Sequence, residues 1–169
     1  VNPEDMHTLR LSWRHDDNHG YVFFNNYQRK RRMDEHNSVT LEGRYKEAPV
    51  EFPKLDLPSG SYGFFPYHFR EGDSELISAN ATPLCRLRGE DGTICVVFYG
   101  DWDPAFVWKD EKHFPTLHLD RKQALQAWKV TLDQDYLILS DDYVWEENGK
   151  LHIEGEKNTV IRCYPKLKE

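Results

Sequence analysis

Apolar and polar residues alternate near the start of the chain, and this pattern predicts a β-hairpin. Leu9, Leu11 and Trp13 alternate with polar residues, so their side chains would share one face of a strand. The run breaks at residues 16–20, which read Asp-Asp-Asn-His-Gly, and apolar residues resume at 21–24. Two β-rich runs around Asx residues and a glycine are typical of a hairpin. Residues 21–24 are apolar at every position, which predicts a strand covered on both faces.

Similar short runs recur along the rest of the chain between turn residues. The further strands that we expect span residues 38–42, 50–52, 55–57, 64–69, 76–79, 82–87, 93–99, 106–108, 136–139, 143–147, 150–154 and 159–163. Asn148-Gly149 tolerates the positive φ angles of a type I′ turn and predicts a hairpin. One segment, residues 121–129, has helical periodicity; Asp120 can cap it, with Gln123 three residues on as in a capping box.

This order of elements predicts the fold class. There is no alternation of strands and helices that would indicate a parallel sheet, and many short strands with regular turns are typical of an antiparallel arrangement. We therefore expect an all-β protein: an antiparallel, jelly-roll-like β-sandwich with one short α-helix near residues 121–129. The length of 169 residues fits one domain. Because the chain begins with Val1 rather than methionine, we expect a piece of a longer multidomain protein.

Charge and hydropathy exclude two classes of partner. The net charge is −7 and the isoelectric point is near 5.6, whereas a nucleic-acid-binding surface would be basic. The one basic run, residues 29–32, follows a strand and is typical of a solvated loop. No run approaches the roughly 18 apolar residues of a membrane span. We therefore expect neither a nucleic acid nor a membrane as partner, and the compartment stays open.

The cysteines and the acidic residues indicate no reactive centre. The chain has an odd number of cysteines without CxxC spacing: Cys85, Cys95 and Cys163. This pattern indicates neither a disulfide framework nor a zinc site. We interpret Cys85 and Cys95 as buried thiols in strands. A glycosidase needs two carboxylates roughly 5 to 9.5 Å apart. The chain has 29 acidic residues, and their pattern singles out no such pair. No GxSxG elbow and no phosphate-binding glycine loop occurs. We assign no catalytic residue and no cofactor.

The cluster of His15, Asp16, Asp17 and His19 is the one group of metal-ligand types. An HxxxH spacing brings two histidines together on a helix, but here the intervening residues are predicted to form the loop of a hairpin. We interpret the cluster as a polar turn and predict no metal site. The weaker alternative is a small enzyme that uses His15 and Asp16 with a metal.

Aromatic residues beside polar ones are the best candidates for ligand binding. A sugar ring can lay its C–H face on an indole or phenol while carboxylates and amides bind its hydroxyl groups. Large rings near predicted turns, with two flanking carboxylates, are therefore candidate carbohydrate-binding residues: Trp102, Asp101, Asp103, Trp108 and Tyr67. The alternative is that these rings belong to the core or pack against a neighbouring domain.

Several segments together resemble a known family. Residues 15–29 read HDDNHGYVFFNNYQR, and this sequence resembles the segment that follows the catalytic barrel in bacterial family 35 glycoside hydrolases, the β-galactosidases. Three further segments match in the family's order: LPSGS with FPY at 57–67, ANATPLCRL at 79–87 and ALQAWKV at 124–130. The Asn-Asn-Tyr-Gln-Arg ending is the most specific of these motifs, whereas the basic residues 30–32 have no place in the family's pattern.

The resemblance implies a non-catalytic accessory β domain that supports the (β/α)₈ barrel of the same parent chain, a retaining β-galactosidase that hydrolyses terminal β-galactosides. The catalytic glutamates lie in a barrel of about 250 residues, which this chain is too short to hold. As an alternative, the chain is a carbohydrate-binding module with Trp102, Trp108 or Tyr67 as platforms and galactosides as ligands. The signature residues Asn25, Asn26, Tyr27, Gln28 and Arg29 are expected to tie the end of their strand to neighbouring loops or to the barrel.

Overall fold

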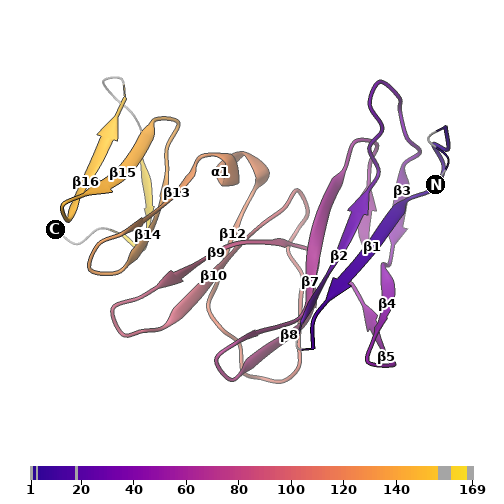
Figure 1. Cartoon of the computed structure of the whole chain (residues 1–169), viewed down its shortest axis with the longest axis horizontal. Helices are drawn as coiled ribbons and strands as arrows, with labels where there is room; N and C mark the ends of the chain where they lie inside the picture. Colours follow the sequence, from indigo (N-terminus) through magenta and orange to yellow (C-terminus); the bar gives the residue numbers. More distant parts are fainter. Residues whose placement is uncertain (1, 3, 18, 156–160, 167–169) are drawn as a thin grey trace. The chain divides into compact units, whose positions relative to one another are not determined.

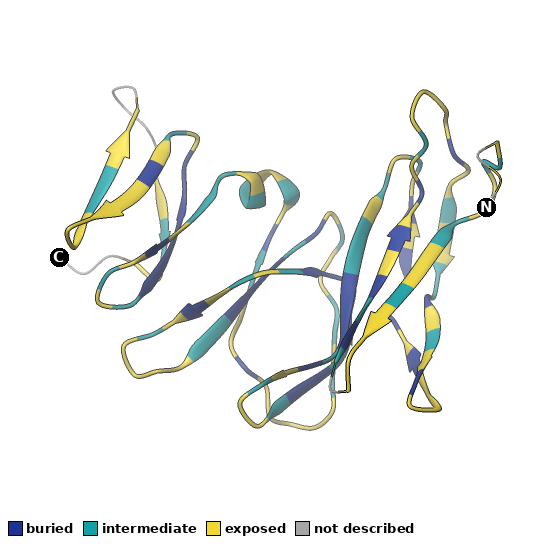
Figure 2. Cartoon of the chain, viewed as in Figure 1, coloured by how far each residue is buried: buried dark blue, intermediate teal, exposed yellow. Residues whose placement is uncertain are grey.

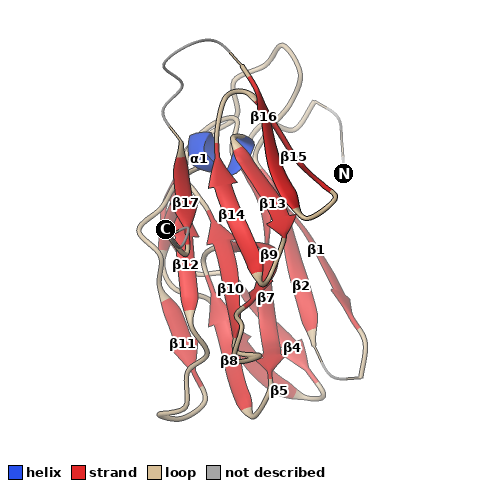
Figure 3. Ribbon diagram, turned by 90° about the vertical axis from the view of Figure 1, so that its left-hand side faces the viewer, coloured by secondary structure: helices blue, strands red, loops and turns tan. Residues whose placement is uncertain are grey.

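The computed structural model describes residues 2, 4–17, 19–155 and 161–166, and strands make up most of them. The chain is an all-β sandwich with one short helix, as the sequence predicts, and α1 (Arg121–Leu125) is the one helix in the described ranges (Figure 3). It divides into two compact units: Val1–Pro83 with Trp102–His113, and Leu84–Asp101 with Phe114–Glu169. We call these unit 1 and unit 2. A single domain over residues 1–169 stays a prediction.

Unit 1 consists of one large sheet and two ribbons (Figure 1). The large sheet has five strands, in the order β1 (Arg10–His15), β2 (Gly20–Asn25), β7 (Tyr62–Glu71), β8 (Ser74–Ala79) and β11 (Phe106–Trp108). The ribbons pair β3 (His36–Val39) with β6 (Leu55–Leu57), and β4 (Glu42–Tyr45) with β5 (Ala48–Glu51). All of these pairs are antiparallel. The hairpin predicted around residues 16–20 is confirmed as β1–β2.

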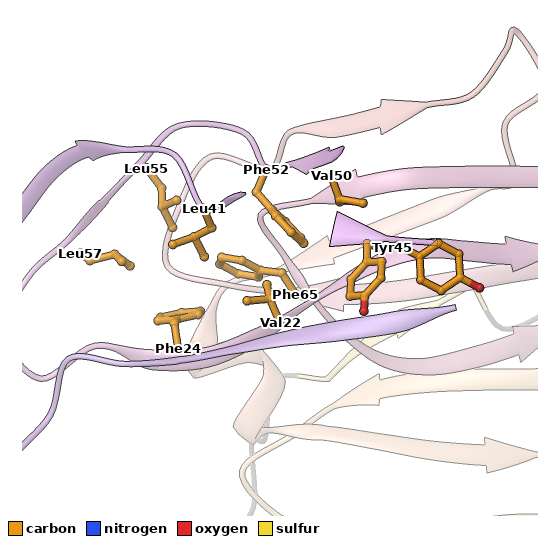
Figure 4. Close-up of a cluster of buried hydrophobic side chains, with 10 residues drawn as sticks. Val22, Phe24, Leu41, Tyr45, Val50, Phe52, Leu55, Leu57 and Phe65 are labelled. Atoms are coloured by element: carbon orange, nitrogen blue, oxygen red, sulfur yellow. The ribbon is translucent and has the colours of Figure 1, made fainter. Parts of the chain in front are cut away.

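The core of unit 1 lies on one face of the large sheet (Figure 4). Val22 and Phe65 stand opposite each other on β2 and β7, and both are buried. Side chains from the ribbons and their connections cover them: Leu41, Tyr45, Val50, Phe52, Leu55 and Leu57. Burial alternates along β2, as Figure 2 shows, because successive strand residues point to opposite faces. Phe23 therefore remains exposed, and the prediction that residues 21–24 are covered on both faces was wrong.

A glycine fixes the start of β2 against this core. Gly20 lies opposite Tyr67, and a Cβ atom at Gly20 would be 2.2 Å from Cζ of that fully buried ring. We expect Gly20→Ala to lower the free energy of unfolding by about 2 kcal/mol, because the ring has nowhere to move. Urea unfolding measures this loss. Gly63→Ala is the graded control, since its Cβ would be 3.1 Å from Phe24 and should cost less. Equal losses at the two glycines would contradict this account.

Unit 2 stacks three small sheets. The first sheet has the strand order β12 (Thr116–Leu119), β10 (Ile94–Tyr99) and β9 (Thr82–Arg88). The second has the order β13 (Ala127–Thr131), β14 (Asp135–Leu139) and β17 (Arg162–Tyr164). The third is the hairpin of β15 (Tyr143–Glu147) and β16 (Lys150–Glu154). The first two residues of β9 belong to unit 1. The pair β10–β12 is parallel. The strand predicted over 159–163 is observed as β17, which begins at Arg162. Residues 159 and 160 of that prediction lie outside the described residues.

Strand β14 is the centre of unit 2, and all five of its residues are buried. Leu137 and Leu139 pack with residues of β9, β10 and β12, whereas Tyr136 and Ile138 pack with Val130 and Val144. Both faces of β14 are therefore covered, which explains its continuous apolar run. The predicted turn of β15–β16 is confirmed, with positive φ angles of 53° and 73° at Asn148 and Gly149.

The helix is shorter than the sequence predicts. Asp120 and Gln123 form the predicted capping box, but α1 ends at Leu125, and β13 begins at Ala127. Leu125 is 84% exposed, so the expected apolar helix face does not form. Trp128 belongs to β13 and donates a hydrogen bond from Nε1 to the carbonyl of Ser140, 3.1 Å away. Pairing with β14 therefore prevails over the helical periodicity of residues 126–129.

Candidate functional site

Asn26 joins two of the motif segments at the end of β2. Its side chain is fully buried, and its Nδ2 group donates to the carbonyl oxygens of Asp34 at 2.8 Å, Leu57 at 3.1 Å and Pro58 at 3.1 Å. Its backbone N–H donates to the carbonyl of Ser61 at 2.8 Å. The Asn-Asn-Tyr-Gln-Arg segment and the Leu-Pro-Ser-Gly-Ser segment, which lie about 30 residues apart in sequence, are therefore bonded to each other.

The other signature residues have different roles. Asn25 is exposed, and its Oδ1 accepts a hydrogen bond from the backbone N–H of Tyr27 at 2.7 Å. Gln28 accepts from Nη1 of Arg10 at 3.0 Å, which connects the segment to β1. Arg29 and Tyr27 are exposed. Asn26 and Gln28 thus bond the end of the strand to neighbouring segments, whereas the side chains of Tyr27 and Arg29 are exposed.

The outer face of β2 and β7 carries a row of aromatic side chains. Tyr21 packs edge-to-face on Phe64 with 5.6 Å between ring centroids, and Phe64 also contacts Phe23 at 5.4 Å. Tyr27 and Tyr62 continue the row with their centroids 6.3 Å apart. Phe23 is 37% exposed, Tyr27 47% and Tyr62 54%. These neighbouring exposed rings make this face the candidate interaction surface of unit 1.

At the Tyr27–Tyr62 end of this row the surface is hollowed. The hollow has a volume of about 770 Å³, and the residues that border it are Phe23, Phe24, Asn25, Tyr27, Gly60, Tyr62, Gly63 and Phe64. Gly60 has a φ of 93°, and a Cβ atom there would meet nothing within 4 Å. We call this concavity the tyrosine hollow. It is the candidate functional site of unit 1.

The residues that the sequence suggested as sugar platforms do not form one site. Tyr67 is fully buried in the core of unit 1, so its ring offers no face to a ligand, which corrects its assignment as a platform. Trp102 is half-buried against Phe24 and Phe65, at 5.8 and 5.7 Å, and is part of the packing around that core. Trp108 stacks on His113 at 4.5 Å.

The two flanking carboxylates are also separate. Asp103 is exposed, and its carbonyl oxygen accepts from Nδ2 of Asn80 at 3.1 Å. Asp101 belongs to unit 2, where its carboxylate pairs with Nε of Arg121 at 2.7 Å. The sequence analysis did not select the rings of the tyrosine hollow. Two phenylalanines stand next to each other in β2, and because only one of them can face the core, the other had to lie on the outer face.

The histidine and aspartate cluster of the first hairpin is a turn. Oδ1 of Asp16 accepts from the backbone N–H of His19 at 2.9 Å, and the backbone N–H of Asp16 donates to the carbonyl of His19 at 3.0 Å. Throughout the described ranges, no three side chains of His, Cys, Asp or Glu are placed to hold a metal ion.

Two buried carboxylates are neutralised by cations. Glu75 lies 2.8 Å from Nδ1 of His68, 3.0 Å from Nζ of Lys109 and 3.1 Å from Nη2 of Arg70. Burial alone would raise the pKa of Glu75, but the hydrogen bonds from His68 and Lys109, with the charge of Arg70, outweigh burial and hold its pKa below the ordinary value. Burial also raises the pKa of Asp135 in unit 2, but its partners outweigh this effect and the pKa is lowered. These partners are Lys129, whose Nζ lies 2.8 Å away, Thr131 and the backbone N–H of Arg88.

The lowered pKa of Glu75 makes a pH-dependent contribution to stability. A carboxylate with a depressed pKa in the folded state stabilises the fold above the unfolded-state value, and this contribution is lost as the pH falls through the folded-state pKa. We expect Glu75→Gln to lower the free energy of unfolding at neutral pH. The difference in this free energy between the variant and the native chain should narrow as the pH falls below 4.5, the ordinary pKa of a glutamate. Urea unfolding at several pH values measures the gap. Glu51→Gln, at an exposed strand position, is the control, and a gap of equal size at all pH values would contradict the assignment.

The three cysteines are free thiols and all are half-buried. Burial raises the pKa of the Cys85 and Cys95 thiols, which keeps them in the unreactive protonated form. Cys95 lines an apolar pocket of about 340 Å³ in unit 2, together with Leu87, Leu117 and Tyr164.

In the described part of the chain, no helix has the length and apolar character needed to cross a membrane. Comparison with known proteins gave no match to a family model and none to a curated protein. The resemblance to family 35 glycoside hydrolases therefore rests on the motif segments themselves.

Proposed function

We propose that this chain is a non-catalytic accessory β domain of a family 35 β-galactosidase, and that it supports the catalytic (β/α)₈ barrel of the same parent chain. The observation that carries this proposal is the bonding of the signature segments through Asn26. The hydrogen bonds of this buried amide account for an asparagine at position 26, and they join the two segments in the fold. The resemblance thus rests on residues that act together in the fold.

The two buried carboxylates have structural partners. A glycosidase acid must keep its proton near neutral pH, which requires a raised pKa. The pKa values of Glu75 and Asp135 are instead lowered by their hydrogen-bonding and charged partners. The two buried ones, Glu75 and Asp135, are held by cations as ionised structural anchors.

A carbohydrate-binding module built on Trp102, Trp108 and Tyr67 has less support. Tyr67 has no accessible face, and Nε1 of Trp102 donates a 2.6 Å hydrogen bond to the carbonyl of Asp56. These contacts assign Tyr67 and Trp102 to the packing of unit 1. A binding function would need rings elsewhere.

An activity assay tests the non-catalytic role. We expect the purified 169-residue chain to release no product from an aryl β-galactoside above the buffer blank. A commercial β-galactosidase serves as the positive control. Saturable hydrolysis that follows the chain through successive purification steps would refute the proposal.

A further inference from the structure

We infer that the free edge of β1 is a docking site for an extended acidic polypeptide, which adds to the large sheet of unit 1 as a further strand. β1 is the first strand of that sheet, and among the described residues it pairs with β2 alone (Figure 3). The inference rests on the backbone groups along this edge and on the charges beside them. It does not depend on the proposed function.

The backbone of β1 offers donors and acceptors along its free edge. The backbone N–H of Asp16 donates to the carbonyl of His19 at the turn, and this bond sets the alternation of the ladder. The even-numbered residues of β1 therefore bond to β2, whereas the N–H and C=O groups of Leu11 and Trp13 point away from it. Within the described chain no hydrogen bond reaches these groups. An unpaired edge without a proline or a bulge is a template for another strand.

The outer face of β1 carries two positive charges without a counter-ion. Arg10 donates to the side chain of Gln28 at 3.0 Å and to the carbonyl of Asp5 at 3.4 Å, and both acceptors are neutral. Arg14 lies over the ring of Phe23, 5.9 Å from its centroid. The ion pairs that arginines form in the described chain involve neither of these two residues. A partner with carboxylates at matching positions would neutralise both.

The opposite face of β1 is apolar and incompletely covered. Leu9 and Trp13 pack against the core of unit 1, but Leu11 between them is 43% exposed. A strand added at this edge would bring its own apolar side chain beside Leu11. The complementary partner therefore carries acidic residues opposite Arg10 and Arg14 and apolar residues opposite Leu11 and Trp13. This pattern is acidic, apolar, polar, apolar, acidic, and it is the same in both strand directions.

The same charges disfavour a second copy of the chain as the occupant. If two β1 strands paired about Ser12, Arg10 of each copy would lie opposite Arg14 of the other. Like charges directly opposite each other destabilise a pair of strands. When a peptide adds to a sheet edge, main-chain hydrogen bonds provide affinity and alternate side chains provide specificity. An acidic strand satisfies both requirements at β1.

An NMR titration of the whole chain with the capped peptide Gly-Glu-Val-Thr-Val-Glu-Gly tests the site. We expect saturable binding, together with slower hydrogen exchange at the backbone amides of Leu11 and Trp13, because these amides gain acceptors. A peptide with lysine in place of both glutamates should bind about tenfold more weakly, since two attractive cross-strand pairs become repulsive.

Variants of the chain show whether β1 is responsible. Arg10→Glu/Arg14→Glu should reverse the preference, so that the lysine peptide binds better than the glutamate peptide. Arg29→Glu/Lys30→Glu is the matched control, because it changes the net charge equally at exposed residues outside β1 and should keep the native preference. Leu11→Pro removes an edge N–H that the β1–β2 ladder does not use, so it should weaken binding of the glutamate peptide. Thermal melting curves check that each variant is folded.

Four results would overturn the site. They are no saturable binding, equal binding of the two peptides, an unchanged preference in Arg10→Glu/Arg14→Glu, and binding without slower exchange at Leu11 and Trp13. Light scattering tests the competing occupant: a dimer of the native chain that the peptide does not dissociate would assign the edge to a second copy and overturn the inference. None of these results bears on the accessory role, which the activity assay tests separately.

Discussion

Replacing Asn26 with alanine is expected to lower the free energy of unfolding by about 3 kcal/mol, the largest effect of any polar substitution in unit 1. The side chain is fully buried, and its Nδ2 group donates to the carbonyls of Asp34, Leu57 and Pro58. Removing the amide leaves these acceptors without their donor, so that backbone hydrogen bonds alone join residue 26 to the segment that precedes β7. Urea unfolding followed by circular dichroism measures the loss.

Two variants separate the hydrogen bonds from the volume of the side chain. Asn26→Asp keeps the shape but replaces the donor with an acceptor, so we expect it to destabilise at least as much as alanine. Asn25→Ala is the neighbouring control; its side chain is exposed and accepts one local bond, so a change within about 0.5 kcal/mol is expected. Similar losses at Asn25 and Asn26 would show that the three-carbonyl contact has no special role.

Replacing Trp102 with alanine should lower the free energy of unfolding by a similar amount, about 3 kcal/mol. The indole makes edge contacts with the rings of Phe24 and Phe65, and its Nε1 donates to the carbonyl of Asp56. The substitution removes both the packing and the bond. Trp102→Phe keeps an aromatic ring and should cost about 1 kcal/mol, the value of one hydrogen bond.

Trp145 provides a matched control for this prediction. It is a tryptophan on the β15–β16 hairpin, it stacks on His152 at 5.3 Å and it is partly exposed. We expect Trp145→Ala to cost about 1 kcal/mol. If Trp102→Ala were no more destabilising than Trp145→Ala, Trp102 would be a surface residue available to ligands and not part of the packing of unit 1.

Local signals in the sequence predicted the elements whose cause is local. The first hairpin, the Asn148-Gly149 turn and the Asp120–Gln123 capping box all depend on residues close together in the chain, and all three are observed. Turn and cap chemistry acts within a few residues, so no knowledge of the packing is needed to predict it.

Features that depend on packing could not be predicted in the same way. Residues 126–129 have helical periodicity, but β14 offers a partner strand, and the chain pairs with it. Tyr67 and Tyr62 are both tyrosines of β7, and only the fold makes one a core residue and the other a wall of the tyrosine hollow. Strand alternation shows that neighbouring rings lie on opposite faces, but the sequence does not show which face the core covers.

Determining the coding sequence upstream of Val1 is the most direct test of the accessory-domain proposal. We expect the reading frame to continue upstream into alternating strands and helices of a (β/α)₈ barrel of about 250 residues, with glutamates at the carboxyl ends of its strands. A start codon directly before Val1, or an upstream domain of another class, would contradict the proposal.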